Sequence, residues 1–189
     1  MIRIGILGDI GSGKSFVAKS FGYPVFNADN EVAKIYKKNK ICFIKIKKLL
    51  PKYIKTFPID KAELTNAILS NKNNIKKITK IVHPLVRKKL NLFLLKNKNK
   101  KIVILDIPLL LENKLKNKDM ILVFVEAKKS DISKRLSKRK SFNSKIFKRL
   151  KEIQLPLDYK RRKSNYIIKN YHTKKIVRKS VKNLLKKIL

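Results

Sequence analysis

The sequence predicts an α/β fold in which a parallel five-stranded sheet has helices on both faces and carries a helical insertion and a lid. Three observations lead to this prediction. Short apolar runs alternate with helical patterns along the chain, which is typical of strand–helix–strand units. A glycine-rich turn at residues 8–15 separates the first apolar run from the first helical pattern. A long, purely helical stretch then interrupts the alternation between the second and third strands.

Five short apolar segments are expected to form the strands. A strand that is buried on both faces has a continuous apolar run, such as Ile102-Val-Ile-Leu105, in place of strict alternation. The five segments cover residues 2–7, 23–27, 101–106, 120–125 and 166–168.

The helical patterns have recognisable starts. Asp60 followed by Glu63 is a capping-box pattern, and Pro84 suits the first turn of a further helix. Residues 173–189 are expected to form a terminal amphipathic helix, and the stretches 71–74 and 97–101 to form loops.

Three functional parts are expected from this order. Residues 1–33 and 99–189 carry the strands and form the core. Residues 34–98 are inserted between two strands and form a helical acceptor-binding subdomain. Residues 129–155, a very basic stretch within the core segment, form the lid region.

The charge of the chain bears on its partners. The 189 residues include 50 basic and 12 acidic side chains, a formal net charge of +38, which first suggests nucleic acid. However, 42 of the basic residues are lysines spread along the whole chain, and only 8 are arginines, the residue type that makes bidentate phosphate and guanine contacts. We therefore expect small-molecule substrates and no specific nucleic acid.

Composition excludes several other classes. A hydrophobic content of 43% is too high for a disordered polycation, and no apolar run reaches the roughly 18 residues of a membrane span. The lone Cys42 excludes a disulfide framework. The expectation is a soluble, cytoplasmic protein with no membrane partner, either a monomer or a weak homo-oligomer.

The strongest motif is the turn Gly8-Asp-Ile-Gly-Ser-Gly-Lys-Ser15, which matches the phosphate loop (P-loop) pattern G-x-x-x-x-G-K-[ST] between a strand and a helix. Its backbone N–H groups can surround a β-phosphate, Lys14 can reach the β- and γ-phosphates, and Ser15 can bind Mg²⁺. This predicts a P-loop NTPase-type core that binds a nucleoside triphosphate. The residues assigned to this nucleotide site are Gly8, Gly11, Ser12, Gly13, Lys14, Ser15 and Phe16.

Two carboxylates follow predicted strands, at the edge where parallel sheets bind ligands. Asp29 follows the second strand and is the candidate base that orients an acceptor hydroxyl; alternatively, it caps a helix that starts near Glu31. Asp106 ends the third strand and is a candidate Mg²⁺ ligand; alternatively, it is a turn residue before Pro108.

Two further candidates are weaker by themselves. Three of the arginines, Arg135, Arg139 and Arg149, lie within fifteen positions. Arg139 is the candidate lid cation that neutralises the transferring phosphoryl group. Alternatively, this stretch is a solvated basic face. His83, which precedes Pro84, is either a site residue or a helix cap.

Five elements, in order, resemble the dephospho-coenzyme A kinase family. They are Ile10-Gly-Ser-Gly-Lys-Ser15, Asn27-Ala-Asp29, Ile81-Val-His-Pro-Leu-Val-Arg87, Leu105-Asp-Ile-Pro-Leu-Leu-Leu-Glu112, and Gln154-Leu-Pro-Leu-Asp-Tyr-Lys-Arg161 with Tyr166-Ile-Ile-Lys-Asn170. The resemblance implies ATP- and Mg²⁺-dependent phosphorylation of the ribose 3′-hydroxyl of dephospho-coenzyme A, the last step of coenzyme A synthesis.

The resemblance also implies roles for individual residues. Asp29, Lys14 and Arg139 are catalytic, and Asn170 lies near the adenine end of ATP. The acceptor is bound by Asp29, His83, Arg87, Asp106 and Glu112, and the metal by Ser15 and Asp106. The sequence departs from the family at Asp9, where a glycine is usual, and at Asn27, which replaces the first Asp of a pair.

Two alternative functions remain open at this point. One is a nucleoside or nucleotide kinase on the same P-loop core, with a different acceptor subdomain. The other is a basic nucleic-acid-binding protein with a vestigial phosphate loop, which would need interleaved aromatics or an arginine-rich face.

Overall fold

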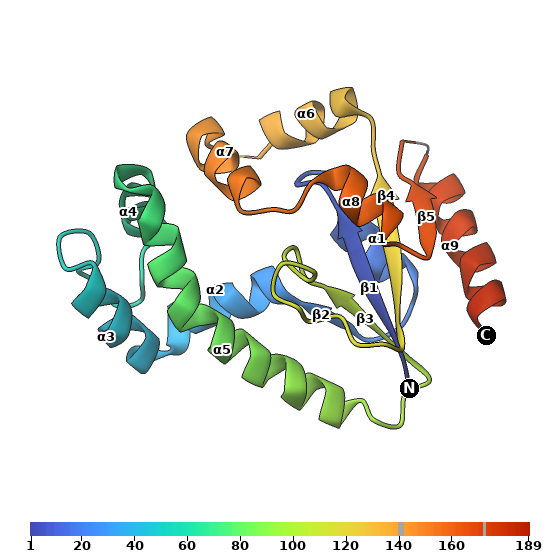
Figure 1. The fold of residues 1–189 in the computed structure, drawn as a ribbon, viewed down its shortest axis with the longest axis horizontal. Coiled ribbons are helices and arrows are strands. Elements are labelled where there is room, and N and C mark those ends of the chain that lie inside the picture. The colour runs from blue at the N-terminus through green and yellow to red at the C-terminus, as the bar shows by residue number, and fades with distance from the viewer. Residues whose placement is uncertain (140–141, 172) are drawn as a thin grey trace. The chain divides into compact units, whose positions relative to one another are not determined.

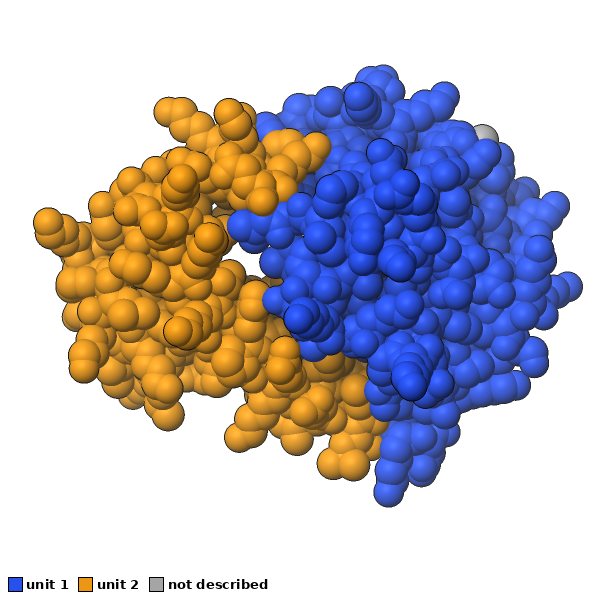
Figure 2. Space-filling view, in the orientation of Figure 1, with its two compact units in different colours: residues 1–27, 96–142, 153–189 blue, residues 28–95, 143–152 orange. Residues whose placement is uncertain are grey.

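The computed structural model describes residues 1–139, 142–171 and 173–189 of the chain. The chain divides into two compact units (Figure 2). Unit 1 comprises Met1–Asn27, Lys96–Phe142 and Ile153–Leu189, and unit 2 comprises Ala28–Leu95 and Asn143–Glu152.

Unit 1 is built on a sheet of five parallel strands in the order β2-β3-β1-β4-β5, which confirms the predicted fold class. The strands are β1 (Ile2–Gly8), β2 (Val25–Asn27), β3 (Ile102–Asp106), β4 (Met120–Glu126) and β5 (Tyr166–Lys169). β2 begins two residues later than predicted. The register places Asn27 of β2 opposite Asp106 of β3, so the last residues of these two strands are neighbours.

Helices cover both faces of this sheet. They are α1 (Lys14–Ser20), α8 (Leu157–Arg162) and α9 (Lys174–Ile188). A further helix of unit 1, α6 (Lys129–Ser137), lies beside the P-loop, where Ile132 and Leu136 approach Gly11. Ile4 and Ile6 of β1 are fully buried in a cluster with residues of α1 and α9, whereas the intervening Gly5 faces Leu110 and Leu122 on the opposite side. Figure 1 shows α1 behind β1 and α8 in front of it. The sequence patterns did not predict α8.

Unit 2 is helical. It contains α2 (Ala28–Lys38), α3 (Lys40–Leu49), α4 (Lys61–Ser70), α5 (Lys72–Lys96) and α7 (Ser144–Glu152). Its core is a separate apolar cluster, in which Cys42, Ile46, Ile54 and Ala67 are fully buried. α7 packs against α4, so this segment of the predicted lid region belongs to unit 2.

α5 corrects two sequence predictions. It runs without interruption through Pro84, although Pro84 was expected to start a helix, and His83 is therefore not a helix cap. The stretch 71–74 is also not a loop: α5 begins at Lys72, and the buried Asn74 donates from Nδ2 to the carbonyl of Ala67 at 2.8 Å. The apolar stripe of α5 is buried both before and after Pro84, and this packing compensates for the N–H that Pro84 cannot donate to the carbonyl of Lys80.

The capping box is formed only in part. Oδ1 of Asp60 accepts hydrogen bonds from the N–H groups of Ala62 and Glu63, at 2.6 and 3.3 Å, and so caps α4. The carboxylate of Glu63 accepts instead from the N–H of Lys55, at 3.2 Å to each oxygen. Glu63 thus secures the loop that precedes α4.

Candidate active site

The P-loop has the backbone conformation that its glycines allow. Gly8, Gly11 and Gly13 have φ angles of 145°, 84° and 88°, which other residues adopt only with strain. Gly13 is also the N-cap of α1, and a Cβ there would overlap Nδ2 of Asn170. The three predicted glycines are therefore required by the shape of the loop.

The side chain of Lys14 lies inside this loop. It is buried, and its Nζ donates to the carbonyls of Asp9 and Gly8 at 2.7 and 3.2 Å. The carboxylate of Asp9 accepts from the N–H of Ile10 at 2.7 Å, so this departure from the family pattern is accommodated within the turn. The hydroxyl of Ser12 is buried and has no hydrogen-bond partner within the described part of the chain.

Three polar side chains meet at the end of the P-loop. Oγ of Ser15 donates to Oδ2 of Asp106 at 2.6 Å, and Nδ2 of Asn27 donates to the same oxygen at 2.6 Å. The register of β2 and β3 brings Asn27 to Asp106, and the P-loop brings Ser15. The structure thus joins the two residues predicted to bind Mg²⁺.

Arg135 is a site residue that the sequence analysis passed over in favour of Arg139. Its guanidinium donates to the carbonyls of Ser12 and Asn170 at 3.0 and 2.9 Å, and Nδ2 of Asn170 donates to the carbonyl of Ser12 at 2.7 Å. Arg135 on α6 and Asn170, which follows β5, therefore both hold the P-loop backbone at Ser12. The signal that could have identified Arg135 is its place on the apolar face of α6, between Ile132 and Leu136, both of which pack near Gly11.

Arg139 follows the end of α6 and is exposed. Its carbonyl accepts from the N–H of Phe142 at 2.9 Å. Residues 140 and 141, which belong to the predicted lid region 129–155, lie outside the described residues.

Glu112 lies within unit 1 and is engaged there. Its Oε1 is 2.7 Å from Nζ of Lys160 and accepts from the N–H of Leu155 at 2.9 Å. This ion pair links the segment after β3 to α8.

Asp29 is in unit 2, in the first turn of α2, and its side chain is exposed. The helix begins at Ala28, so Asp29 does not cap a helix that starts at Glu31, and that alternative interpretation is wrong.

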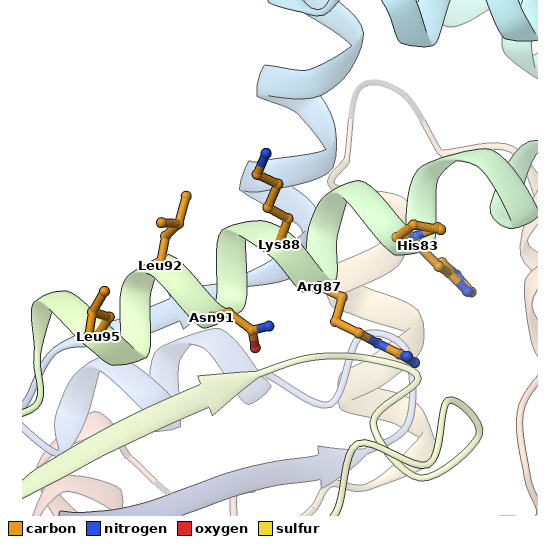
Figure 3. Close-up of a pocket in the computed structure, with 7 residues that line it drawn as sticks. His83, Arg87, Lys88, Asn91, Leu92 and Leu95 are labelled. Carbon is orange, nitrogen blue, oxygen red and sulfur yellow. The ribbon is translucent and has the colours of Figure 1, made fainter.

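His83 and Arg87 lie one turn apart on α5 and line a pocket of about 490 Å³ (Figure 3). The pKa of His83 is lowered from its ordinary value of 6.5, first because burial disfavours the charged ring and second because the Arg87 guanidinium repels it. The ring is therefore held in its neutral form at pH 7.

Two absences concern the described residues only. None of their helices is long and apolar enough to cross a membrane, and they contain no group of three His, Cys, Asp or Glu side chains that could hold a metal ion.

A P-loop between the first strand and first helix of a parallel 2-3-1-4-5 sheet, with a separate helical unit, defines the class of P-loop kinases. The family model described as dephospho-CoA kinase matches residues 2–175. The chain therefore belongs to the dephospho-CoA kinase family. It is a phosphotransferase of the final step of CoA biosynthesis and uses ATP.

Individual relatives and solved structures are similar to nearly the whole chain. The dephospho-CoA kinase of the Wolbachia symbiont of Brugia malayi is 34% identical over 187 residues, which cover 96% of this chain and 95% of that protein. Among solved structures, a Thermus thermophilus protein is 27% identical with a TM-score of 0.78, covering 100% of this chain and 98% of its own. The dephospho-CoA kinase of Campylobacter jejuni shares the fold, with a TM-score of 0.64 at 22% identity over 98% of this chain and 96% of that chain.

Proposed function

We propose that this chain transfers the γ-phosphoryl group of ATP to the 3′-hydroxyl of the ribose of dephospho-CoA. The observation that carries the proposal is the P-loop, in which Lys14 points inward and Ser15 is hydrogen-bonded to Asp106. A kinase needs cationic and metal-binding groups at this point, because negative charge shifts toward the bridging oxygen during transfer. We assign ATP to residues 8–16 and Asn170 of unit 1.

The acceptor is assigned to the helical insertion, residues 34–98, which lies in unit 2 apart from its last three residues. His83 and Arg87 are the proposed contacts of the acceptor phosphates, because both line the α5 pocket. Asp29 is the proposed base, since its exposed carboxylate can accept a hydrogen bond from a hydroxyl and orient it. Arg139 is the proposed lid cation of the region 129–155.

The residues present fit Mg²⁺. Ser15 and Asp106 supply a hydroxyl and a carboxylate oxygen already 2.6 Å apart, and Mg²⁺ in kinases takes one or two protein oxygens and completes its shell with phosphates and water. The ion would neutralise charge on the β- and γ-phosphate oxygens. Asn27, which donates to Asp106 at 2.6 Å, would keep that carboxylate in place.

A coupled assay for ADP formation tests the proposal. We expect turnover with dephospho-CoA, none above background with phosphopantetheine or nucleoside monophosphates, and a product with a new 3′-phosphomonoester signal in ³¹P NMR. Chelation should abolish turnover and Mg²⁺ should restore it, with a higher Mg²⁺ requirement for Asp106→Asn. Preferred turnover of a nucleoside or nucleoside monophosphate would favour the alternative kinase function instead.

We also propose that the enzyme works in the cytoplasm as a monomer or weak homo-oligomer without a specific nucleic-acid partner. Sedimentation equilibrium tests the oligomeric state. A salt titration with single-stranded and duplex nucleic acid tests the last point, because binding driven by lysine charge alone falls steeply with salt and shows no sequence preference.

A further inference from the structure

The pocket on α5 is longer than two acceptor contacts require. The residues that line it lie along α5, which extends about three turns beyond His83. Their side chains point to both sides of the helix, with His83, Arg87 and Asn91 on one side and Lys88, Leu92 and Leu95 on the other (Figure 3). The lining residues are His83, Pro84, Arg87, Lys88, Asn91, Leu92 and Leu95. At about 1.5 Å of rise per residue, the twelve steps from His83 to Leu95 span about 18 Å. The shape suits a long, narrow ligand.

The chemistry of the pocket changes along its length. The first half presents the side chains of His83, Arg87 and Lys88, and the second half presents Asn91, Leu92 and Leu95. Leu92 and Leu95 are 51% and 66% exposed, although the same helix buries Leu90. A cationic end joined to an apolar end matches a ligand that has phosphates at one end and an uncharged arm at the other.

We propose that the second half of this pocket, Asn91 to Leu95, binds the pantetheine arm of the acceptor, while Arg87 and Lys88 bind its diphosphate. This inference rests on the proposed function. The arm has two amides, which suit the donor and acceptor of the Asn91 side chain, and a dimethyl-substituted carbon, which suits the two leucines. A nucleoside monophosphate has no group to fill this half.

Leu92→Ser and Leu95→Ser test the proposal by kinetics with two acceptors. One is dephospho-CoA, and the other is a truncated acceptor, adenosine 5′-diphosphate with a methyl ester in place of pantetheine. We expect each variant to raise the KM for dephospho-CoA about 5- to 10-fold, the equivalent of roughly one lost apolar side-chain contact. The KM for the truncated acceptor and the kcat for dephospho-CoA should stay within twofold of the parent.

Two matched variants calibrate this result. Leu49→Ser changes a leucine of unit 2 that is similarly exposed, at 48%, but lies on α3, and it should leave both KM values unchanged. Arg87→Gln should raise the KM of both acceptors together, because both carry the diphosphate. In addition, phosphopantetheine should compete with dephospho-CoA in the parent and about fivefold less well in Leu95→Ser.

The outcomes separate the arm site from the proposed function. If the parent does not phosphorylate dephospho-CoA, the proposed function itself is wrong. If the parent does phosphorylate dephospho-CoA, the leucine variants decide the inference. If they leave the KM for both acceptors unchanged, or raise both equally, the arm binds elsewhere and only this inference is overturned.

Discussion

Nζ of Lys160 lies 2.7 Å from Oε1 of Glu112, and only 1% of the lysine side chain and 11% of the glutamate side chain are exposed. The ammonium also donates to Oε1 of Gln154 at 3.4 Å. In a buried pair each charge is tolerated because its partner is present, and removal of one partner leaves the other uncompensated. The pair connects segments that are 48 positions apart and lie within unit 1.

Lys160→Ala should therefore lower the free energy of unfolding by about 3–5 kcal/mol, as measured by urea denaturation followed by circular dichroism. The double variant Lys160→Met with Glu112→Leu should recover most of this loss, because it leaves no buried charge. Arg161→Ala is the control, since its ion pair with Glu126 is largely exposed and should contribute about 1 kcal/mol or less. Equal effects of the Lys160 and Arg161 substitutions would contradict the assignment of a buried pair.

Lys14→Ala should reduce kcat about 10²- to 10³-fold, because the lysine stabilises charge on the phosphates during transfer. Its Nζ donates to carbonyls of its own loop, and we expect the melting temperature to change by a few degrees at most. Lys19→Ala, an exposed lysine of the same helix, should leave kcat unchanged. If Lys14→Ala keeps a kcat within a few-fold of that of the parent, the assignment of the nucleotide to the P-loop is wrong.

Asp29→Asn should lower kcat about 10²-fold or more, within the range typical of general bases, and should do so with little change in KM for ATP. The loss could be smaller than in acyl transfer, because phosphoryl transfer does not require early deprotonation of the hydroxyl. Glu31→Gln is the matched control, because it removes the other acidic residue from the first turn of α2. Either substitution should cost only about 0.3–1 kcal/mol through the helix dipole, and similar kcat values for the two variants would exclude Asp29 as the base.

Arg135 and Arg139 should differ in what they support. Arg135→Ala removes the donors to the loop carbonyls, so we expect weaker ATP binding and a lower melting temperature. Arg139→Ala should leave both nearly unchanged and should reduce kcat, because a lid cation acts mainly when the site closes. Titration of ATP by calorimetry alongside steady-state kinetics checks this contrast, and a reversal of the two patterns would reassign the lid cation to Arg135.

His83 should contribute to the pH dependence of stability. Its pKa is lowered from 6.5 in the folded protein, so between that lowered value and 6.5 the unfolded chain binds more protons than the folded chain. Stability should consequently fall as the pH decreases through this window, and His83→Gln should flatten the curve there. Melting temperatures measured from pH 5 to 8 test this expectation. Arg87→Gln removes one of the two causes of the lowered pKa, so the pKa of His83 in the folded protein should move toward 6.5 and the pH window should narrow. Identical stability curves for the parent and His83→Gln would contradict the lowered pKa.

The sequence was most informative where local rules decide the structure. The P-loop requires three glycines for backbone reasons, and the strands are short, mainly apolar segments such as Ile102-Val-Ile-Leu105, so both could be predicted from short stretches. Asp106 was predicted to end a strand, and its meeting with Ser15 follows from the parallel arrangement alone. These features depend on interactions among a few residues that are close together in the chain.

Features that depend on packing between distant segments were not predictable in this way. α5 passes through Pro84 because the tertiary packing of its apolar stripe outweighs a local helix-breaking signal. Lys160 is one of 42 lysines, and nothing near it in the chain indicates that it is buried beside Glu112. Arg135 and Arg139 lie in the same basic stretch, and the docking of α6 on Gly11 brings Arg135 to the P-loop.

The membership of α7 in unit 2 has a consequence for protein engineering. Because α7 packs against α4 while the chain before and after it belongs to unit 1, the backbone passes from one unit to the other four times. The helical unit therefore cannot be excised between two cut points, because a transplant of residues 28–95 alone would lose the contact of α4 with α7. A chimaera with a different acceptor preference would have to exchange residues 143–152 at the same time.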